Sequence, residues 1–173
     1  MSNMIFTSDP IIKDIRWRKL ADIIVDKYGI INSYVELFII CASIGISDGQ
    51  KEDSLISDDD SFTPINLPRN VLSRQEHNDN LDFLYQSLVF SFETTLSTEE
   101  KINLAFRDDE TTGTKKFEQL RLCANYGMRI LSEAIEGYED EYMIMEEVLS
   151  LLKNKVLDKE TFMKLFLEEE LEG

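Results

Sequence analysis

The sequence of 173 residues is poor in residues that interrupt helices, with seven glycines and three prolines. Its long segments repeat apolar residues at intervals of three and four, which is the period of a helix. Hydrophobic residues make up 43% of the chain and include ten phenylalanines, which excludes a disordered acidic chain. We predict an all-α single domain over 1–173, a bundle of about six to seven helices with one short extended segment near Phe62 to Leu67.

Histidine and cysteine, the residues of many catalytic and metal sites, are nearly missing. His77 is the one histidine and lies in a polar segment, whereas a nucleophilic serine or cysteine needs a neighbouring base. Cys41 and Cys123 lie in apolar helical patterns without CxxC spacing, so we expect buried, reduced thiols. Glycine-rich phosphate loops are also missing. We therefore predict no enzyme, no catalytic residue, no cofactor and no metal.

Basic residues are outnumbered, with 18 Lys and Arg against 34 Asp and Glu and a formal net charge of -16. The resulting negative potential opposes binding to phosphate backbones and to anionic lipid. We expect protein partners with a basic surface, and neither direct nucleic-acid binding nor a membrane. The consecutive residues Asp58, Asp59 and Asp60 lack the alternating ligands of a calcium loop, so we interpret 47–69 as a solvated acidic loop.

Two alternatives follow from the charges. Acidic clusters at 52–60, 108–110, 139–147 and 168–172 would suit an inhibitor that imitates DNA and occupies the basic cleft of a DNA-binding protein. The basic cluster from Lys13 to Lys19 would suit a nucleic-acid-binding module, although acidic residues share its helix.

Long hydrophobic runs are missing as well, because the most apolar stretch, Ser33 to Gly45, is shorter than the roughly 20 residues of a membrane span. The N-terminus lacks the pattern of a secretory signal, so we expect a cytoplasmic protein. Ser33 and Glu36 match a capping box that starts a helix, and Gly45 is expected to end it. Its apolar residues surround the whole helix, which predicts a central position, buried within the monomer or by a second copy in a homo-oligomer.

Caps and apolar spacing place the other helices. Gly29 and Gly137 are expected to end helices, Ser97 and Glu100 to form a second capping box, and Thr114 and Asp158 to be N-caps. The predicted helices are Asp14 to Tyr28, Leu81 to Phe92, Ser97 to Phe106, Lys115 to Ile135, Glu139 to Asn154 and Lys159 to Leu171, followed by a frayed acidic tail at 168–173.

Two places are candidates for a partner-binding surface. Gly127 lies inside a predicted helix, where glycine costs about 1 kcal/mol against alanine, so either a second helix packs closely or a partner reaches the backbone. Asn125 and Tyr126 flank it, and Asn125 could instead bond a neighbouring backbone. Arg16, Trp17 and Lys19 form the second candidate, with pairing inside the helix as the alternative.

Two blocks resemble a known family. The segments INSYVELFIICASIGISDGQK and LRLCANYGMRILSEAI are similar to the aromatic helix and the Ala-Asn-x-Gly helix of Dnd system-associated protein family 4, small helical proteins encoded beside bacterial DNA phosphorothioation genes. The resemblance covers about a quarter of the chain, and the acidic 47–63 connector and the acidic tail have no counterpart in it. Related accessory proteins of defence islands are the alternative. The resemblance implies a non-catalytic subunit of a modification-linked restriction or antiviral defence system, and it transfers no catalytic residue.

Overall fold

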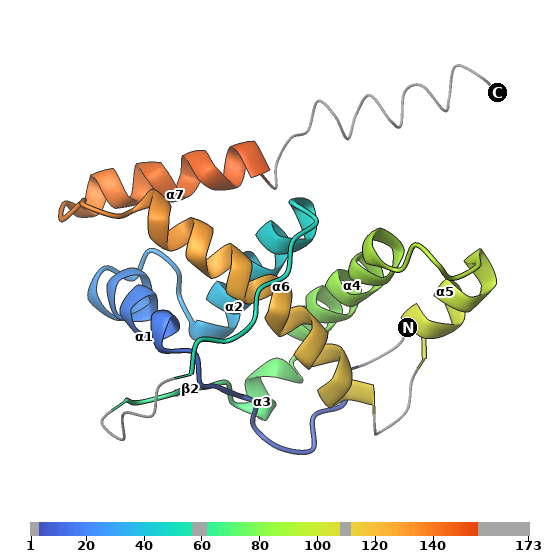
Figure 1. The fold of residues 1–173 in the computed structure, drawn as a ribbon. Coiled ribbons are helices and arrows are strands. Elements are labelled where there is room, and N and C mark those ends of the chain that lie inside the picture. Colours follow the sequence, from blue (N-terminus) through green and yellow to red (C-terminus); the bar gives the residue numbers. More distant parts are fainter. Residues whose placement is uncertain (1–3, 57–61, 108–111, 156–173) are drawn as a thin grey trace.

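The computed structural model describes residues 4–56, 62–107 and 112–155. These residues form an all-α single domain, as predicted, with one small two-stranded sheet (Figure 1). The elements in chain order are β1 (Ile11–Ile12), α1 (Ile15–Ala21), the π-helix η1 (Asp22–Lys27), α2 (Tyr34–Ser47), β2 (Ile65–Asn66), α3 (Arg69–Leu72), α4 (Gln75–Phe92), α5 (Thr98–Ala105), α6 (Thr112–Ala134) and α7 (Glu141–Lys155).

The fold is built on the crossing of α2 and α6, which pack against each other through two glycines (Figure 1). A Cβ atom at Gly127 would collide with the backbone carbonyl of Cys41, and one at Gly45 with that of Cys123. The two contacts are reciprocal, since each helix contributes one Cys-Ala-x-x-Gly segment and the two helices run antiparallel. Close helix packing is therefore the reason for the glycine inside the α6 sequence.

The prediction that Gly45 ends its helix is wrong. α2 continues to Ser47, and Gly49 beyond it has the positive φ of +64° that the turn requires. A glycine near the end of an apolar run matches both a stop signal and a close contact, and the contact lies more than 70 residues away in the chain. The start was predicted correctly, because the Ser33 hydroxyl accepts from the Glu36 amide, while the Glu36 carboxylate accepts from Asn32 rather than Ser33.

The central position of α2 is confirmed by an aromatic stack around Phe38, which is fully buried. The Phe38 ring lies between Trp17 of α1, with centroids 6.0 Å apart, and Phe117 of α6, 4.6 Å away. Phe6 meets Phe117 edge to face at 6.0 Å. The N-terminal segment, α1, α2 and α6 therefore share one core, and α4 packs on a further side of α2.

The predicted helix Asp14 to Tyr28 is interrupted in its second half. Asp14 is the N-cap, and after Ala21 the hydrogen bonds widen to the π pattern, in which the Tyr28 amide donates to the Ile23 carbonyl at 3.2 Å. Gly29, with φ +60°, then turns the chain as predicted. Apolar spacing gave no sign of the π-helix, because the apolar side chains remain on the core side.

Two helix starts differ from the predictions. α6 begins at Thr112, so Thr114 lies inside the helix and is not its N-cap. α4 begins at Gln75, six residues before the predicted Leu81, because the buried Asn78 donates to the Met4 carbonyl and accepts from the Met4 amide. A polar segment thus became helical through a contact with the chain's first described residues.

Several other predictions are confirmed. Ser97 and Glu100 form a full capping box at α5, and Gly137, with φ +87°, follows α6. The predicted extended segment contains β2, which pairs antiparallel with β1. The helix at Lys159 to Leu171, its N-cap Asp158, the tail and Asp58 to Asp60 lie outside the described residues.

Candidate functional site

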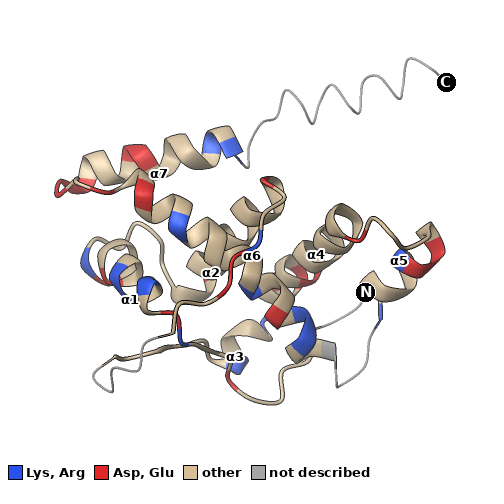
Figure 2. Ribbon diagram, viewed as in Figure 1, with Lys and Arg blue, Asp and Glu red and all other residues tan. Residues whose placement is uncertain are grey.

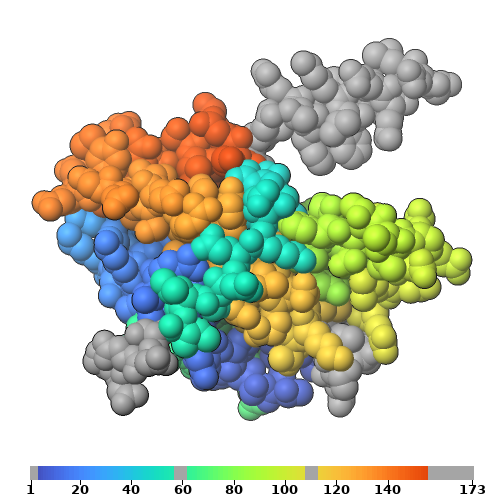
Figure 3. Space-filling model, viewed as in Figure 1, coloured from blue at the N-terminus to red at the C-terminus, as the bar shows by residue number. Residues whose placement is uncertain are grey.

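A short connector lies across the surface of the bundle between α1 and α6, and we call residues 50–56 the strap (Figure 3). Backbone hydrogen bonds hold it at both ends. The Glu52 amide donates to the Leu122 carbonyl of α6 at 2.9 Å, and the Ile15 amide donates to the Leu55 carbonyl at 3.0 Å. The strap therefore belongs to the folded body, although its sequence reads as a solvated loop.

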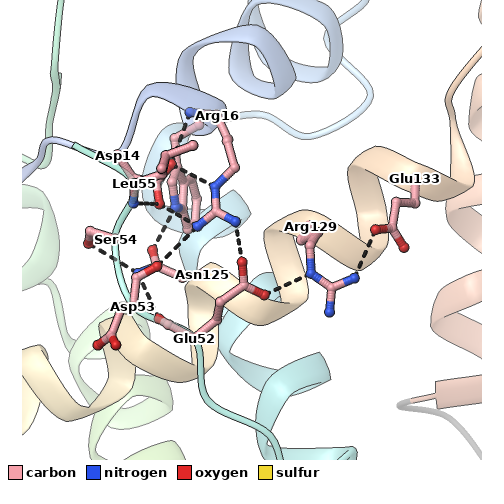
Figure 4. A network of polar contacts seen from close by, with 10 residues as sticks. Asp14, Arg16, Glu52, Asp53, Ser54, Leu55, Asn125, Arg129 and Glu133 are labelled. Carbon is pink, nitrogen blue, oxygen red and sulfur yellow. Dashed lines mark hydrogen bonds and ion pairs between the residues drawn. The ribbon is translucent and has the colours of Figure 1, made fainter. Parts of the chain in front are cut away.

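The side chain of Asn125 of α6 binds the strap through hydrogen bonds (Figure 4). Its side chain is fully buried, and its amide nitrogen donates to the Glu52 carbonyl at 3.1 Å and to the Ser54 hydroxyl at 3.2 Å. Its side-chain oxygen accepts from the Trp17 indole at 2.9 Å. Asn125 thus bonds a neighbouring backbone, which was the structural alternative for this residue.

A chain of charges continues from this point along the surface (Figure 4). Asp14, fully buried, accepts from the Arg16 guanidinium at 2.6 Å and from the Leu55 amide at 2.9 Å. Glu52 of the strap bonds Arg16 and also Arg129 of α6, the latter at 2.7 Å. Arg129 reaches Glu133 one turn further at 2.8 Å. The two arginines are thus paired with three carboxylates, which leaves one negative charge in excess.

Titration of this chain follows from burial and hydrogen bonding. Burial by itself would raise the pKa of Asp14, but the hydrogen bonds from the Arg16 side chain and from two backbone amides together lower it below 3.8. The pKa of Glu52 is also lowered, because the bonds from Arg129 and Arg16 outweigh its partial burial. Both carboxylates are therefore held in their charged form and are poor candidates for general acids.

A groove lies beside this chain, between α1–η1 and the second half of α6, and we call it the α1–α6 groove. Its volume is about 570 Å³, which is within the range of ligand-binding clefts. The apolar side chains along it include Ile15 and Ile23, which are half-buried, and Leu20, Met128 and Ile135, which are buried. Its polar lining is Arg16, Lys19, Arg129, Ser132, Glu133, Glu136, Tyr138 and Glu139.

The two walls of the groove run parallel. Trp17 meets Asn125 near the start of α1, and Tyr28, after η1, donates to the Glu139 carbonyl at 2.5 Å. The π-helix contributes Ile23 to the lining of the groove. Such segments occur often at functional sites.

The sequence-predicted partner residues have different positions. Trp17, Asn125 and Gly127 are buried within the protein, so in this conformation they offer no surface to a partner. Arg16 and Lys19 line the α1–α6 groove. The sixth candidate, the half-buried Tyr126, donates to Asp48 at 3.1 Å, away from the groove.

No local sequence pattern singles out Glu52 or Arg129. Their ion pair joins the strap to α6, and Glu52 also bonds Arg16 of α1. In the remaining basic cluster, Arg18 donates to the carbonyls of Thr63 and Pro64 at 3.2 and 3.0 Å. α1 carries three basic side chains of this cluster, and two of them, Arg16 and Arg18, form hydrogen bonds within the protein. These bonds weaken the nucleic-acid alternative.

The described residues contain no group of three His, Cys, Asp or Glu side chains placed to hold a metal ion. Burial raises the pKa of the Cys41 thiol strongly and that of Cys123 to about 11, so both are protonated at neutral pH. No helix among residues 4–56, 62–107 and 112–155 is long and apolar enough to cross a membrane.

Comparisons with known proteins add no relative. No family model matches the sequence, and no curated protein and no solved structure matches it.

Proposed function

We propose that this protein is a non-catalytic accessory subunit of a bacterial defence system linked to DNA modification, and that a partner protein docks in the α1–α6 groove. The observation that carries the proposal is the groove itself. It combines apolar side chains with exposed charges of both signs and lies between two helices fixed to one core.

The polar chain beside the groove supports binding rather than a reaction. Arg16, Glu52 and Arg129 bond one another in a fixed arrangement, and Asp14 is sealed beneath the strap. A carboxylate that is paired in this way is a poor proton acceptor. The same pairing holds the side chains of the groove wall in place before a partner binds, which favours docking.

The defence setting is supported by the two-block resemblance. The blocks correspond to α2 and α6, including the glycines at their crossing. A likeness in these residues concerns how a core is packed, so it favours a shared fold and assigns no chemistry.

The test fills the groove. Ser132 is half-buried among its lining residues, so Ser132→Trp places an indole in the groove without removing a core side chain. Ser150→Trp, at an exposed position of α7, is the matched control. Tagged proteins are recovered from the native host. We expect a stoichiometric defence or DNA-processing protein with the wild type and Ser150→Trp and its loss with Ser132→Trp. Equal recovery with both variants would refute groove docking, and recovery of no such protein would refute the function.

A DNA-imitating inhibitor is the second candidate, and the turn between α6 and α7 favours it. Exposed carboxylates gather there in a short span of chain (Figure 2). They are Glu133, Glu136, Glu139, Asp140 and Glu141. A mimic's complex with its target would weaken steeply as salt rises and would be displaced by duplex DNA. A complex that resists both treatments excludes this candidate.

A further inference from the structure

We propose that the occupant of the α1–α6 groove is a partner α-helix that runs parallel to α1 and α6, with acidic residues in its first turn and basic residues in its last. This inference rests on the proposed docking function and adds the chemistry and direction of the partner.

The first step is the unequal charge along the groove. Its beginning has three cations, Arg16, Lys19 and Arg129, and its far end has the exposed carboxylates of Glu136 and Glu139. Arg16 and Arg129 are engaged by Glu52, whereas Lys19 takes part in none of the ion pairs among the described residues. Lys19 and Glu136 are therefore the charges most free to meet a partner.

The second step is the direction that these charges favour. A helix is stabilised by acidic residues near its N-terminus and basic residues near its C-terminus, because they complement its macrodipole. A helix charged in this way matches the groove in one direction only, with its N-terminus beside Lys19 and its C-terminus beside Glu136. In the opposite direction both ends meet like charges.

The third step is size. Arg129 and Glu136 are seven residues apart on α6, which corresponds to about 10 Å along the helix axis, or two turns. Two turns of a docked helix present apolar residues at i, i+3 or i+4 and i+7. The half-buried side chains of Ile15 and Ile23 supply apolar contacts over a similar length on the other wall.

The test uses two displayed libraries of 14-residue peptides with a randomised apolar face. In one library, Glu occupies the first turn and Lys the last, and in the other the charges are exchanged. The wild-type protein is the bait, and binders that also bind Ser132→Trp are removed. Each selected peptide is resynthesised with both charge arrangements, and its dissociation constant is measured by fluorescence anisotropy. We expect the acid-first form to bind about three- to tenfold more tightly, as two exposed ion pairs would give.

The decisive variant is Lys19→Glu with Glu136→Lys, which reverses the groove and leaves the net charge unchanged. It should reverse the preference between the two forms, while the control Lys115→Glu with Glu99→Lys, at exposed sites outside the groove, should not. A proline in the middle of the peptide should abolish binding of a helix.

Equal binding of the two forms, an unchanged preference in the reversed groove, or full binding of the proline peptide overturns the inference but leaves groove docking standing. A selection that yields no binder sensitive to Ser132→Trp also overturns the helical occupant, whereas groove docking itself is refuted by equal recovery of the partner protein with Ser132→Trp and Ser150→Trp.

Discussion

Replacing Gly127 by alanine tests the central crossing most directly. The added Cβ would lie 2.7 Å from the carbonyl carbon of Cys41, against about 3.5–4.0 Å for an ordinary contact. Because the obstacle is backbone, no side-chain rotation relieves it, and α2 and α6 must separate by about 1 Å. Overpacking of this kind costs about 3 kcal/mol, and the better helix propensity of alanine offsets about 1 kcal/mol.

We therefore expect Gly127→Ala to lower the free energy of unfolding by about 2 kcal/mol, or the melting temperature by about 4–8 °C for a domain of this size. Urea unfolding followed by circular dichroism measures the change. Gly45→Ala should behave similarly, since its Cβ would lie 2.7 Å from the carbonyl carbon of Cys123. Ser150→Ala, at an exposed helical site, should stay within about 0.5 kcal/mol of the wild type. A Gly127→Ala protein as stable as the wild type would show that the helices are not in close contact.

Three further predictions concern the buried polar groups. Asn125→Ala leaves the Trp17 indole without its acceptor, so unfolding should become easier by about 1–3 kcal/mol and the emission of the single tryptophan should change; unchanged stability would contradict the hydrogen bond. The pKa of Asp14 is lower in the folded protein than its ordinary value of 3.8. The ionised carboxylate therefore stabilises the protein above that pH, and this stabilisation is lost as the pH falls below it. Asp14→Asn should flatten this part of the curve of unfolding free energy against pH. Cys41 and Cys123 should react with a thiol reagent at neutral pH only after unfolding, and rapid labelling of the native protein would show that they are accessible.

The fold was predictable from sequence where its signals are local. A capping serine acts within one turn of its own helix, so Ser33 and Ser97 marked helix starts correctly. A positive φ is likewise a property of one residue, which is why Gly29 and Gly137 were identified. The role of Gly45 depends on a carbonyl in another helix, and no pattern in its own segment distinguishes a stop from a contact.

The candidate site was less predictable, because its parts meet only in the folded chain. Arg16 and Lys19 were found as a basic cluster, but the groove that they line requires α6. Glu52 looked like one acidic residue among many in a connector. Its importance comes from two arginines more than 30 positions away in either direction, and charge alone does not indicate such pairing.

The repeated Cys-Ala-x-x-Gly segments make matching contacts at the crossing but differ in their intervening residues. At the crossing itself α2 and α6 are equivalent, since each gives one glycine and one cysteine carbonyl. The residues between the cysteine and the glycine differ. In α2, Ser43 bonds the Ile39 carbonyl within its own helix, whereas in α6 Asn125 bonds the strap.

α6 therefore makes three kinds of contact along one continuous helix: with α2, with the strap and with the groove. Gly127 fixes the distance of α6 from α2, and Asn125, two residues earlier, binds the strap. Arg129 and Ser132 follow on the same helix and line the groove. A helix is stiff over so few residues, so a change that moves α6 at the crossing also moves one wall of the groove. Gly127→Ala should consequently weaken partner docking even under conditions in which the protein remains folded, whereas Ser150→Ala should not. Full binding by a folded Gly127→Ala protein would show that the crossing and the groove are independent.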